Sequence, residues 1–215
     1  YALERFWNHA FCMEEEEWKE KSKEYCKPIY LISDEPYREL VYDNICVPYL
    51  MNYYDNTIVS YSFSKSLSLP GERIGYIAVC PKAMDANSLY LAVCGAGRSL
   101  GYVCAPSLFQ QVIAKCIDAK VNIDAYRQNR DLLYENLTDY GFECVKPDGA
   151  FYLFVKSPDK DAYSFYEKAK SYEILLVPCD DFGVDGYVRI AYCVDIKRIK
   201  NSLPKFKVLA KEYDL

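Results

Sequence analysis

The sequence contains little of what a metalloprotein or a nucleic-acid-binding protein needs. It has a single histidine, His9, and its ten cysteines include no Cys-x-x-Cys pair. Zinc sites draw on closely spaced Cys and His ligands, so we expect no metal site. With 26 Lys and Arg residues against 31 Asp and Glu residues, the net charge is −5 and no basic stripe could follow a phosphate backbone. We therefore expect no nucleic-acid partner.

Long apolar runs and leader-like segments are also absent. The longest apolar runs, such as residues 89–94, are far too short to span a bilayer, and no charged-then-apolar stretch opens the chain. Isolated cysteines are typical of reduced thiols that pack as small apolar side chains. We therefore predict a soluble, cytoplasmic protein without a membrane partner. Because the first residue is Tyr1 and not Met, we also expect that something upstream was removed or left out.

What the chain does have is enough apolar material for a sizeable core. Its 215 residues are 51% apolar, which suits one large domain or two small ones. Glutamates and then lysines predict a helix over residues 13–26, in the order that suits the helix dipole. Continuous apolar runs at 29–32, 57–61 and 74–79 are typical of strands covered on both faces. This order indicates an α/β layer with a mostly parallel sheet.

The rest of the chain changes to a mixed pattern. Further helices are predicted by caps, apolar stripes or glycine stops, from 105, over 123–140, over 161–171 and from 195, the last interrupted by Pro204. Two segments joined by a Pro-Asp-Gly turn predict a hairpin, 142–145 and 150–155, and two more strands are expected at 174–177 and 187–192. We therefore place a first domain over residues 1–120 and a smaller α+β domain over 121–215.

Two of the predicted strands end in residues that carry chemistry. The strand at 29–32 leads into Ser33-Asp34, and the strand at 57–61 leads into Ser64-Lys65. Ligands of open α/β sheets bind beyond the carboxyl ends of the strands, so Asp34 and Lys65 should face one crevice. Taken singly, such a lysine is usually solvated and such an aspartate is usually a turn or cap residue. Only their joint order favours a site.

That joint order resembles the fold-type I, pyridoxal-phosphate-dependent aminotransferases of class I/II, the aspartate aminotransferase family. The resemblance covers roughly residues 13–215 and rests on five motifs in the family's order: Ser33-Asp34-Glu35-Pro36-Tyr37, Ser62-Phe63-Ser64-Lys65 with Arg73, Gly149-Ala150-Phe151-Tyr152, Val177-Pro178 with Phe182-Gly183, and Tyr187-Val188-Arg189-Ile190. It implies that residues 1–120 are part of the cofactor-binding large domain, with its mostly parallel sheet and helices, and that residues 121–215 form the small C-terminal domain.

The resemblance also assigns roles around the cofactor, pyridoxal 5′-phosphate. Lys65 would be the catalytic amine that attaches to the cofactor aldehyde and then moves a proton. Asp34 would pair with the protonated ring nitrogen and stabilise its charge. Tyr37 resembles the family tyrosine that donates to the phenolic oxygen of the cofactor.

Further matching residues would hold the phosphate and the substrate. Ser62, Ser64 and Arg73 resemble phosphate ligands, because hydroxyls and a planar guanidinium suit a dianion. For Ser64 and Ser66 a structural role in the loop is kept as an alternative. Arg189 matches the family arginine that grips the substrate α-carboxylate through a bidentate fork.

The chain departs from the family pattern in three places. The family chain is about twice as long, and its first half carries a glycine-rich phosphate loop and a ring-stacking aromatic that this sequence does not contain. Asn8 would match the asparagine that bonds the phenolic oxygen of the cofactor, but Asn8-His9-Ala10-Phe11 stands where the family has an Asn-Pro-Thr-Gly-like turn. Cys179 stands where the family's Val-Pro-Gly has its glycine.

We therefore predict the C-terminal half of a pyridoxal-phosphate-dependent aminotransferase, truncated at its N-terminus and acting on an amino acid and a 2-oxo acid. The full-length form would be a homodimer. Two alternatives stay open: a lyase reaction of the same fold, such as β-elimination or decarboxylation, and a non-catalytic remnant or one half of a split enzyme that needs a partner chain. The sequence does not identify the side chain of the amino donor.

Overall fold

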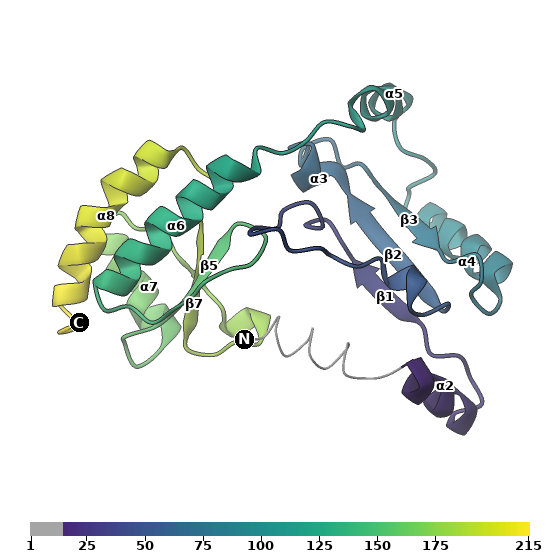
Figure 1. The fold of residues 1–215 in the computed structure, drawn as a ribbon, viewed down its shortest axis with the longest axis horizontal. Coiled ribbons are helices and arrows are strands. Elements are labelled where there is room, and N and C mark those ends of the chain that lie inside the picture. The colour runs from purple at the N-terminus through teal and green to yellow at the C-terminus, as the bar shows by residue number, and fades with distance from the viewer. Residues whose placement is uncertain (1–14) are drawn as a thin grey trace. The chain divides into compact units, whose positions relative to one another are not determined.

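The structure is a computed structural model that describes residues 15–215, and these residues fold into two compact units (Figure 1). The N-terminal unit comprises residues 15–40 and Cys46–Val121. The C-terminal unit comprises Val41–Ile45 and Asn122–Leu215. Each unit has its own sheet with helices, which confirms the predicted α/β class.

The N-terminal unit is built on a sheet with the strand order β1-β2-β3. Strands β1 (Leu31–Asp34) and β2 (Thr57–Ser62) are parallel, as expected, and β1 begins and ends two residues later than the predicted strand at 29–32. Strand β3 (Gly75–Val79) is antiparallel to β2. Two parallel strands that follow each other in the chain are usually joined by a crossover helix. The connection between β2 and β3, residues 63–74, contains only the single helical turn α3 (Phe63–Ser66), so the chain returns antiparallel.

The two faces of this sheet differ in burial. On one face Tyr61 packs with Phe63 and Ile74 against Ile113 of α5 (Ser107–Cys116), and all four side chains are buried. On the other face Ile32 of β1 and Ile77 of β3 stay exposed at 69% and 54%. The core of the N-terminal unit therefore lies between the sheet and α5.

The remaining helices of the N-terminal unit are α2 (Glu15–Glu24), the short 3-10 turn η1 (Leu50–Asn52) and α4 (Ala86–Ser99). Helix α2 confirms the glutamate-then-lysine pattern. The sequence did not indicate helix α4, which contains Gly95 and Gly97 and whose N-cap residue Asp85 makes no capping hydrogen bond. Glycine inside a helix is unfavourable, so the local signals for α4 are weak.

The C-terminal unit has a sheet with the order β4-β5-β7-β6, and all three strand pairs are antiparallel. Strands β4 (Cys144–Val145) and β5 (Tyr152–Lys156) form the predicted hairpin. Strand β7 (Tyr187–Ala191) also follows the prediction. Strand β6 is shorter than the predicted strand at 174–177, since only Val177–Pro178 pairs with β7.

Three helices cover this second sheet, each near its predicted position: α6 (Ile123–Asp139), α7 (Ala162–Ser171) and α8 (Ile196–Lys211). Side-chain oxygens of Asn122, Asp161 and Asp195 cap their N-termini. Helices α6 and α8 lie side by side (Figure 1). Helix α8 continues past Pro204 without interruption, because buried residues on both sides of the proline, Leu203 and Phe206, anchor it in the core.

A short segment from the first part of the chain, Val41–Ile45, belongs to the C-terminal unit. The amide of Tyr42 donates to the Asp148 carbonyl at 2.9 Å. The fully buried Arg130 of α6 lies 2.9 Å from Asp43 Oδ2 and 4.5 Å from the centroid of the Tyr42 ring. Buried arginines need such partners, so Arg130 is the anchor of this segment.

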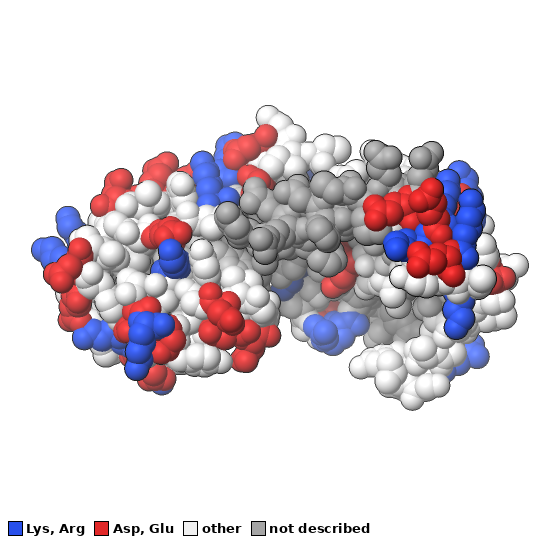
Figure 2. All heavy atoms as spheres, turned by 90° about the horizontal axis from the view of Figure 1, so that it is seen from below, with Lys and Arg blue, Asp and Glu red and all other residues white. Residues whose placement is uncertain are grey.

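Surface charge is mixed on the face that Figure 2 shows, where Lys and Arg side chains alternate with Asp and Glu side chains over the described residues. No helix within residues 15–215 is long and apolar enough to cross a membrane. Within the same residues no cluster of His, Cys, Asp and Glu side chains could hold a metal ion.

Candidate active site

The parallel pairing of β1 and β2 brings their carboxyl ends to one edge of the sheet. Asp34, the last residue of β1, is the register partner of Ser60, and the Glu35 amide donates to the Ser60 carbonyl at 2.8 Å. Asp34 is exposed, and within the described part of the chain its carboxylate takes part in no hydrogen bond or ion pair. The carboxylate is therefore available to a cationic group at this edge.

A buried ion pair fixes the turn that follows Asp34. The guanidinium of Arg38 lies 2.5 Å from Glu35 Oε2, and the two side chains are 9% and 8% exposed. Arg38 also donates to the carbonyls of Val47 and Pro48, each at 2.8 Å. This network fixes both ends of the turn from Glu35 to Arg38, which contains Tyr37. No sequence motif indicated this ion pair.

Lys65 lies on α3, directly after β2. Ser62 caps this turn, because its side chain accepts a hydrogen bond from the Ser64 amide at 3.2 Å, and the two serine Oγ atoms lie 2.6 Å apart. The Nζ atom of Lys65 lies 5.5 Å from the centroid of the Tyr37 ring. Two predicted site residues from different motifs are thus close together.

Arg73 approaches the same edge from the β3 side. The Phe63 amide donates to the Ile74 carbonyl at 3.1 Å, and Ser62 pairs with Gly75 in the sheet register. Arg73 itself has a left-handed backbone, with φ at 52°, which is uncommon for an arginine. Its guanidinium is exposed and donates to the Pro70 carbonyl at 2.8 Å. The serine pair and Arg73 therefore belong to one strand junction.

Two phenols lie close to Phe63 of α3: that of Tyr61, which is buried in the core, and that of Tyr76, which is half exposed. Burial raises the pKa of Tyr61 to about 12, and the Tyr61 hydroxyl donates to Ser66 Oγ at 2.7 Å. Burial also raises the pKa of Tyr76, whose ring stacks on that of Tyr61 with centroids 5.1 Å apart. Both phenols keep their protons at neutral pH. Ser66 thus accepts a hydrogen bond from the core.

Arg189 lies in the C-terminal unit, in the middle of β7. Its register partners are Phe154 on β5 and Val177 on β6. The guanidinium carbon lies 4.3 Å from the ring centroid of Tyr152 and 4.6 Å from that of Phe182. Both aromatic residues belong to motifs noted in the sequence, but only the structure shows that they contact Arg189.

The turn before β7 tolerates Cys179 in the position of the family glycine. Its φ of −101° is in the range that any L-residue adopts. Its Sγ atom is buried and donates to the Val177 carbonyl at 3.7 Å, and burial raises the pKa of the thiol to about 11. Cys179 therefore acts as a buried core residue of this turn.

The predicted site residues lie in both units, and one of them lies outside the described residues. Asp34, Tyr37, Ser62, Ser64, Lys65 and Arg73 all lie around one edge of the N-terminal sheet. Arg189 belongs to the C-terminal unit. Asn8 lies outside the described residues.

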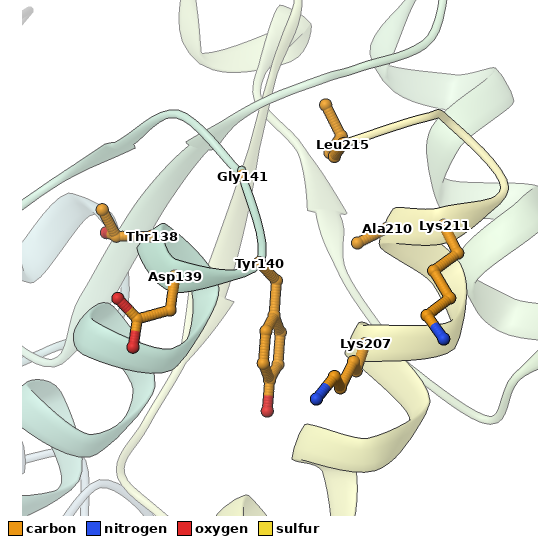
Figure 3. Close-up of a pocket in the computed structure, with 8 residues that line it drawn as sticks. All are labelled: Thr138, Asp139, Tyr140, Gly141, Lys207, Ala210, Lys211 and Leu215. Atoms are coloured by element: carbon orange, nitrogen blue, oxygen red, sulfur yellow. The ribbon is translucent and has the colours of Figure 1, made fainter.

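A shallow pocket of about 260 Å³ lies elsewhere, between the ends of α6 and α8 (Figure 3). Lys207 points toward Tyr140, with its Nζ atom 5.8 Å from the ring centroid. None of the predicted site residues lines this pocket. It contributes nothing to the site.

Comparison with known proteins identifies the family. Residues 11–206 match the family model described as aminotransferase class I and II. The chain is 28% identical over 198 residues to aromatic-amino-acid aminotransferase 2 of Thermococcus litoralis, covering 87% of this chain and 50% of that protein. It is 31% identical over 221 residues to a probable aspartate/prephenate aminotransferase of Aquifex aeolicus, covering 93% and 54%.

Solved structures agree with these relatives. An aminotransferase from Eubacterium rectale is 58% identical and superposes with a TM-score of 0.89, over 94% of this chain and 50% of that chain. Aspartate aminotransferase from Thermotoga maritima is 26% identical with a TM-score of 0.76, over 89% and 50%. The chain thus spans about half the length of the relatives it matches. By the extent of the family match and the order of its motifs, the chain belongs to the class I and II aminotransferase family.

Proposed function

We propose that the chain forms the C-terminal part of a pyridoxal-5′-phosphate-dependent aminotransferase, which moves an amino group from an amino acid to a 2-oxo acid. Family membership implies the cofactor and the reaction class. The observation that carries the proposal is the single end of the sheet that holds an exposed carboxylate, an amine beside a phenol ring, and a pair of serine hydroxyls on the turn after β2.

These residues fit the cofactor by their chemistry. The carboxylate of Asp34 suits the protonated pyridine nitrogen, because it is exposed and makes no ion pair with another described residue. The phenol of Tyr37 suits the cofactor's phenolic oxygen, to which it would donate a hydrogen bond. Ser62, Ser64 and Arg73 offer hydroxyl and guanidinium donors to the phosphate. When bound, pyridoxal phosphate supplies an aldehyde and an electron-accepting ring.

The chain's own residues would then do the following. Lys65 holds the cofactor through its Nζ atom and, once released, carries a proton between two carbon atoms of the substrate complex. Arg189 binds the substrate α-carboxylate and so orients the amino group. Asn8 would donate to the cofactor's phenolic oxygen beside Tyr37.

The two units correspond to two domains in this proposal. The N-terminal unit would be the partial cofactor-binding domain, over residues 1–120, and the C-terminal unit the small domain, over residues 121–215. The complete enzyme would be a cytoplasmic homodimer with small-molecule substrates. The alternative is a lyase reaction carried out by the same residues. Product analysis distinguishes the two reactions, because only transamination yields a new amino acid from the 2-oxo acid.

Labelling with the cofactor tests the proposal directly. The purified chain is incubated with pyridoxal phosphate, reduced with borohydride and mapped by peptide mass spectrometry. We expect the pyridoxyl group on Lys65, and its loss in Lys65→Arg. Lys82→Arg, in the loop after β3, is the matched control and should label normally. A label on another lysine, or none at saturating cofactor, would contradict the proposal.

A further inference from the structure

The contacts of Arg189 differ from those of the other buried or half-buried arginines. Arg38 and Arg130 each pair with a carboxylate. Arg189 contacts two aromatic rings, from β5 and from the 3-10 turn η2 (Asp180–Phe182), at 4.3 and 4.6 Å. Both distances are well inside the range of about 6 Å within which a cation is attracted to a ring face.

Carboxylates are available in the same turn, yet they do not pair with Arg189. Asp181 accepts a hydrogen bond from the Tyr163 hydroxyl at 3.2 Å. Asp180 has a buried Oδ2 atom without a hydrogen-bond partner. Within residues 15–215 the Arg189 guanidinium makes no hydrogen bond or ion pair. Ring faces leave the in-plane N–H donors of a guanidinium open, so none of its donors is used by the described residues and an external anion can accept from them.

The backbone holds Phe182 in this place. The Phe182 amide donates to the Cys179 carbonyl at 2.8 Å, and the Gly183 amide donates to the Asp180 carbonyl at 3.0 Å. Gly183 has φ at 76°, the left-handed region that suits glycine. Phe182 is 58% exposed, so burial gives little reason for a large apolar side chain there. Contact with Arg189 gives one.

We infer that Tyr152 and Phe182 are positioning residues for carboxylate binding, because their rings hold the Arg189 guanidinium away from Asp180 and Asp181 and present its donor edge to a carboxylate. This inference rests on the proposed function of Arg189. It predicts that removing either ring weakens carboxylate binding without unfolding the C-terminal unit.

The test uses the 215-residue chain and propionate, a carboxylate without a reactive amino group. Binding is followed by the NMR signal of the Arg189 Nε–H group, at constant ionic strength. We expect Phe182→Leu and Tyr152→Leu each to weaken binding about 2- to 10-fold. Phe182→Tyr and Tyr152→Phe keep the rings and should bind like the parent. Tyr166→Leu is the matched control, since that ring lies 5.4 Å from Lys170 Nζ in the same unit.

Arg189→Met separates this inference from the proposed function. If Arg189→Met abolishes propionate binding while both ring-to-leucine variants bind like the parent, the inference is overturned and the role of Arg189 stands. If Arg189→Met does not change the binding, or the parent binds no propionate, the role of Arg189 fails and the inference falls with it. Thermal unfolding of each variant identifies any that has lost its fold.

Discussion

At the scale of single residues, the charged side chains are of two kinds: exposed or half-buried ones without an ion pair among the described residues, and buried ones that are paired. Asp34 and Arg189 keep their charges free of ion pairs with described residues, whereas Glu35 and Arg38 satisfy each other in a buried pair. Unpaired charges at the surface cost little, and they are what a charged ligand needs. The buried Glu35–Arg38 pair fixes the turn that directly follows Asp34.

Breaking the buried pair should therefore reduce stability strongly. Arg38→Met leaves the Glu35 carboxylate buried without its cation, and we expect a loss of about 3–5 kcal/mol in the free energy of unfolding. Urea denaturation measures it. The double variant Glu35→Gln with Arg38→Met removes both charges and should recover part of the loss. A single variant as stable as the parent would show that the pair is not desolvated.

The Tyr61 phenol predicts a pH dependence of stability. Its pKa is about 12 in the folded chain because of burial, against about 10 in an unfolded chain. Between these values the folded state binds more protons, so its stability falls as the pH rises above about 10. Tyr61→Phe removes this group and should give a shallower decline, as measured by urea denaturation at several pH values. Parallel curves would contradict the assignment.

At the scale of elements, caps and turns act locally, while the Val41–Ile45 segment depends on a distant residue. The buried Arg130 of α6 joins it to the C-terminal unit through Asp43 and Tyr42. This segment directly follows the turn that carries Tyr37. The turn that carries Tyr37 thus continues directly into a segment that Arg130 holds in the C-terminal unit.

Replacing that anchor should open the segment without unfolding the unit. Arg130→Met leaves Asp43 without its partner, and we expect faster hydrogen exchange at the Tyr42 amide, which bonds the Asp148 carbonyl. NMR-detected exchange measures it. Arg127→Met is the control, because Arg127 lies on the same helix in an exposed pair with Asp124. Equal exchange rates in both variants would show that Arg130 is not the anchor.

At the scale of the whole molecule, the N-terminal unit presents much apolar surface. Ile32 and Ile77 are exposed on one sheet face, and the exposed residues of α4 include Leu91 at 68%. Contiguous exposed apolar surface and open strand edges favour association. The 215 residues alone should therefore be a poor transaminase, although Asp34 and Lys65 are both in place.

Association and activity of the isolated chain test this expectation together. We expect light scattering after gel filtration to show a mass that rises with protein concentration, and slow or no transamination across a panel of amino acids with added pyridoxal phosphate. Ile77→Lys should shift the chain toward the monomer. Leu175→Lys, at a 76% exposed position of the C-terminal unit, is the control. A monomer saturated with cofactor and turning over normally would overturn the prediction.

The sequence by itself determined the family and most of the local structure. Helices α6, α7 and α8 each begin at a capping residue, α6 also ends at a glycine, and the β4–β5 hairpin follows from its turn, because these signals act within a few residues. The motif residues around Lys65 could be named for the same reason. Their order along the chain is a property of the sequence.

Only the tertiary structure decided what depends on contacts between distant segments. It turned β3 antiparallel to β2, formed α4 despite two internal glycines, and attached Val41–Ile45 to the C-terminal unit. It also brought Tyr152 and Phe182 to Arg189 from two different elements. A sequence pattern reports the period of one element, whereas these features arise where side chains far apart in the chain exclude water from each other.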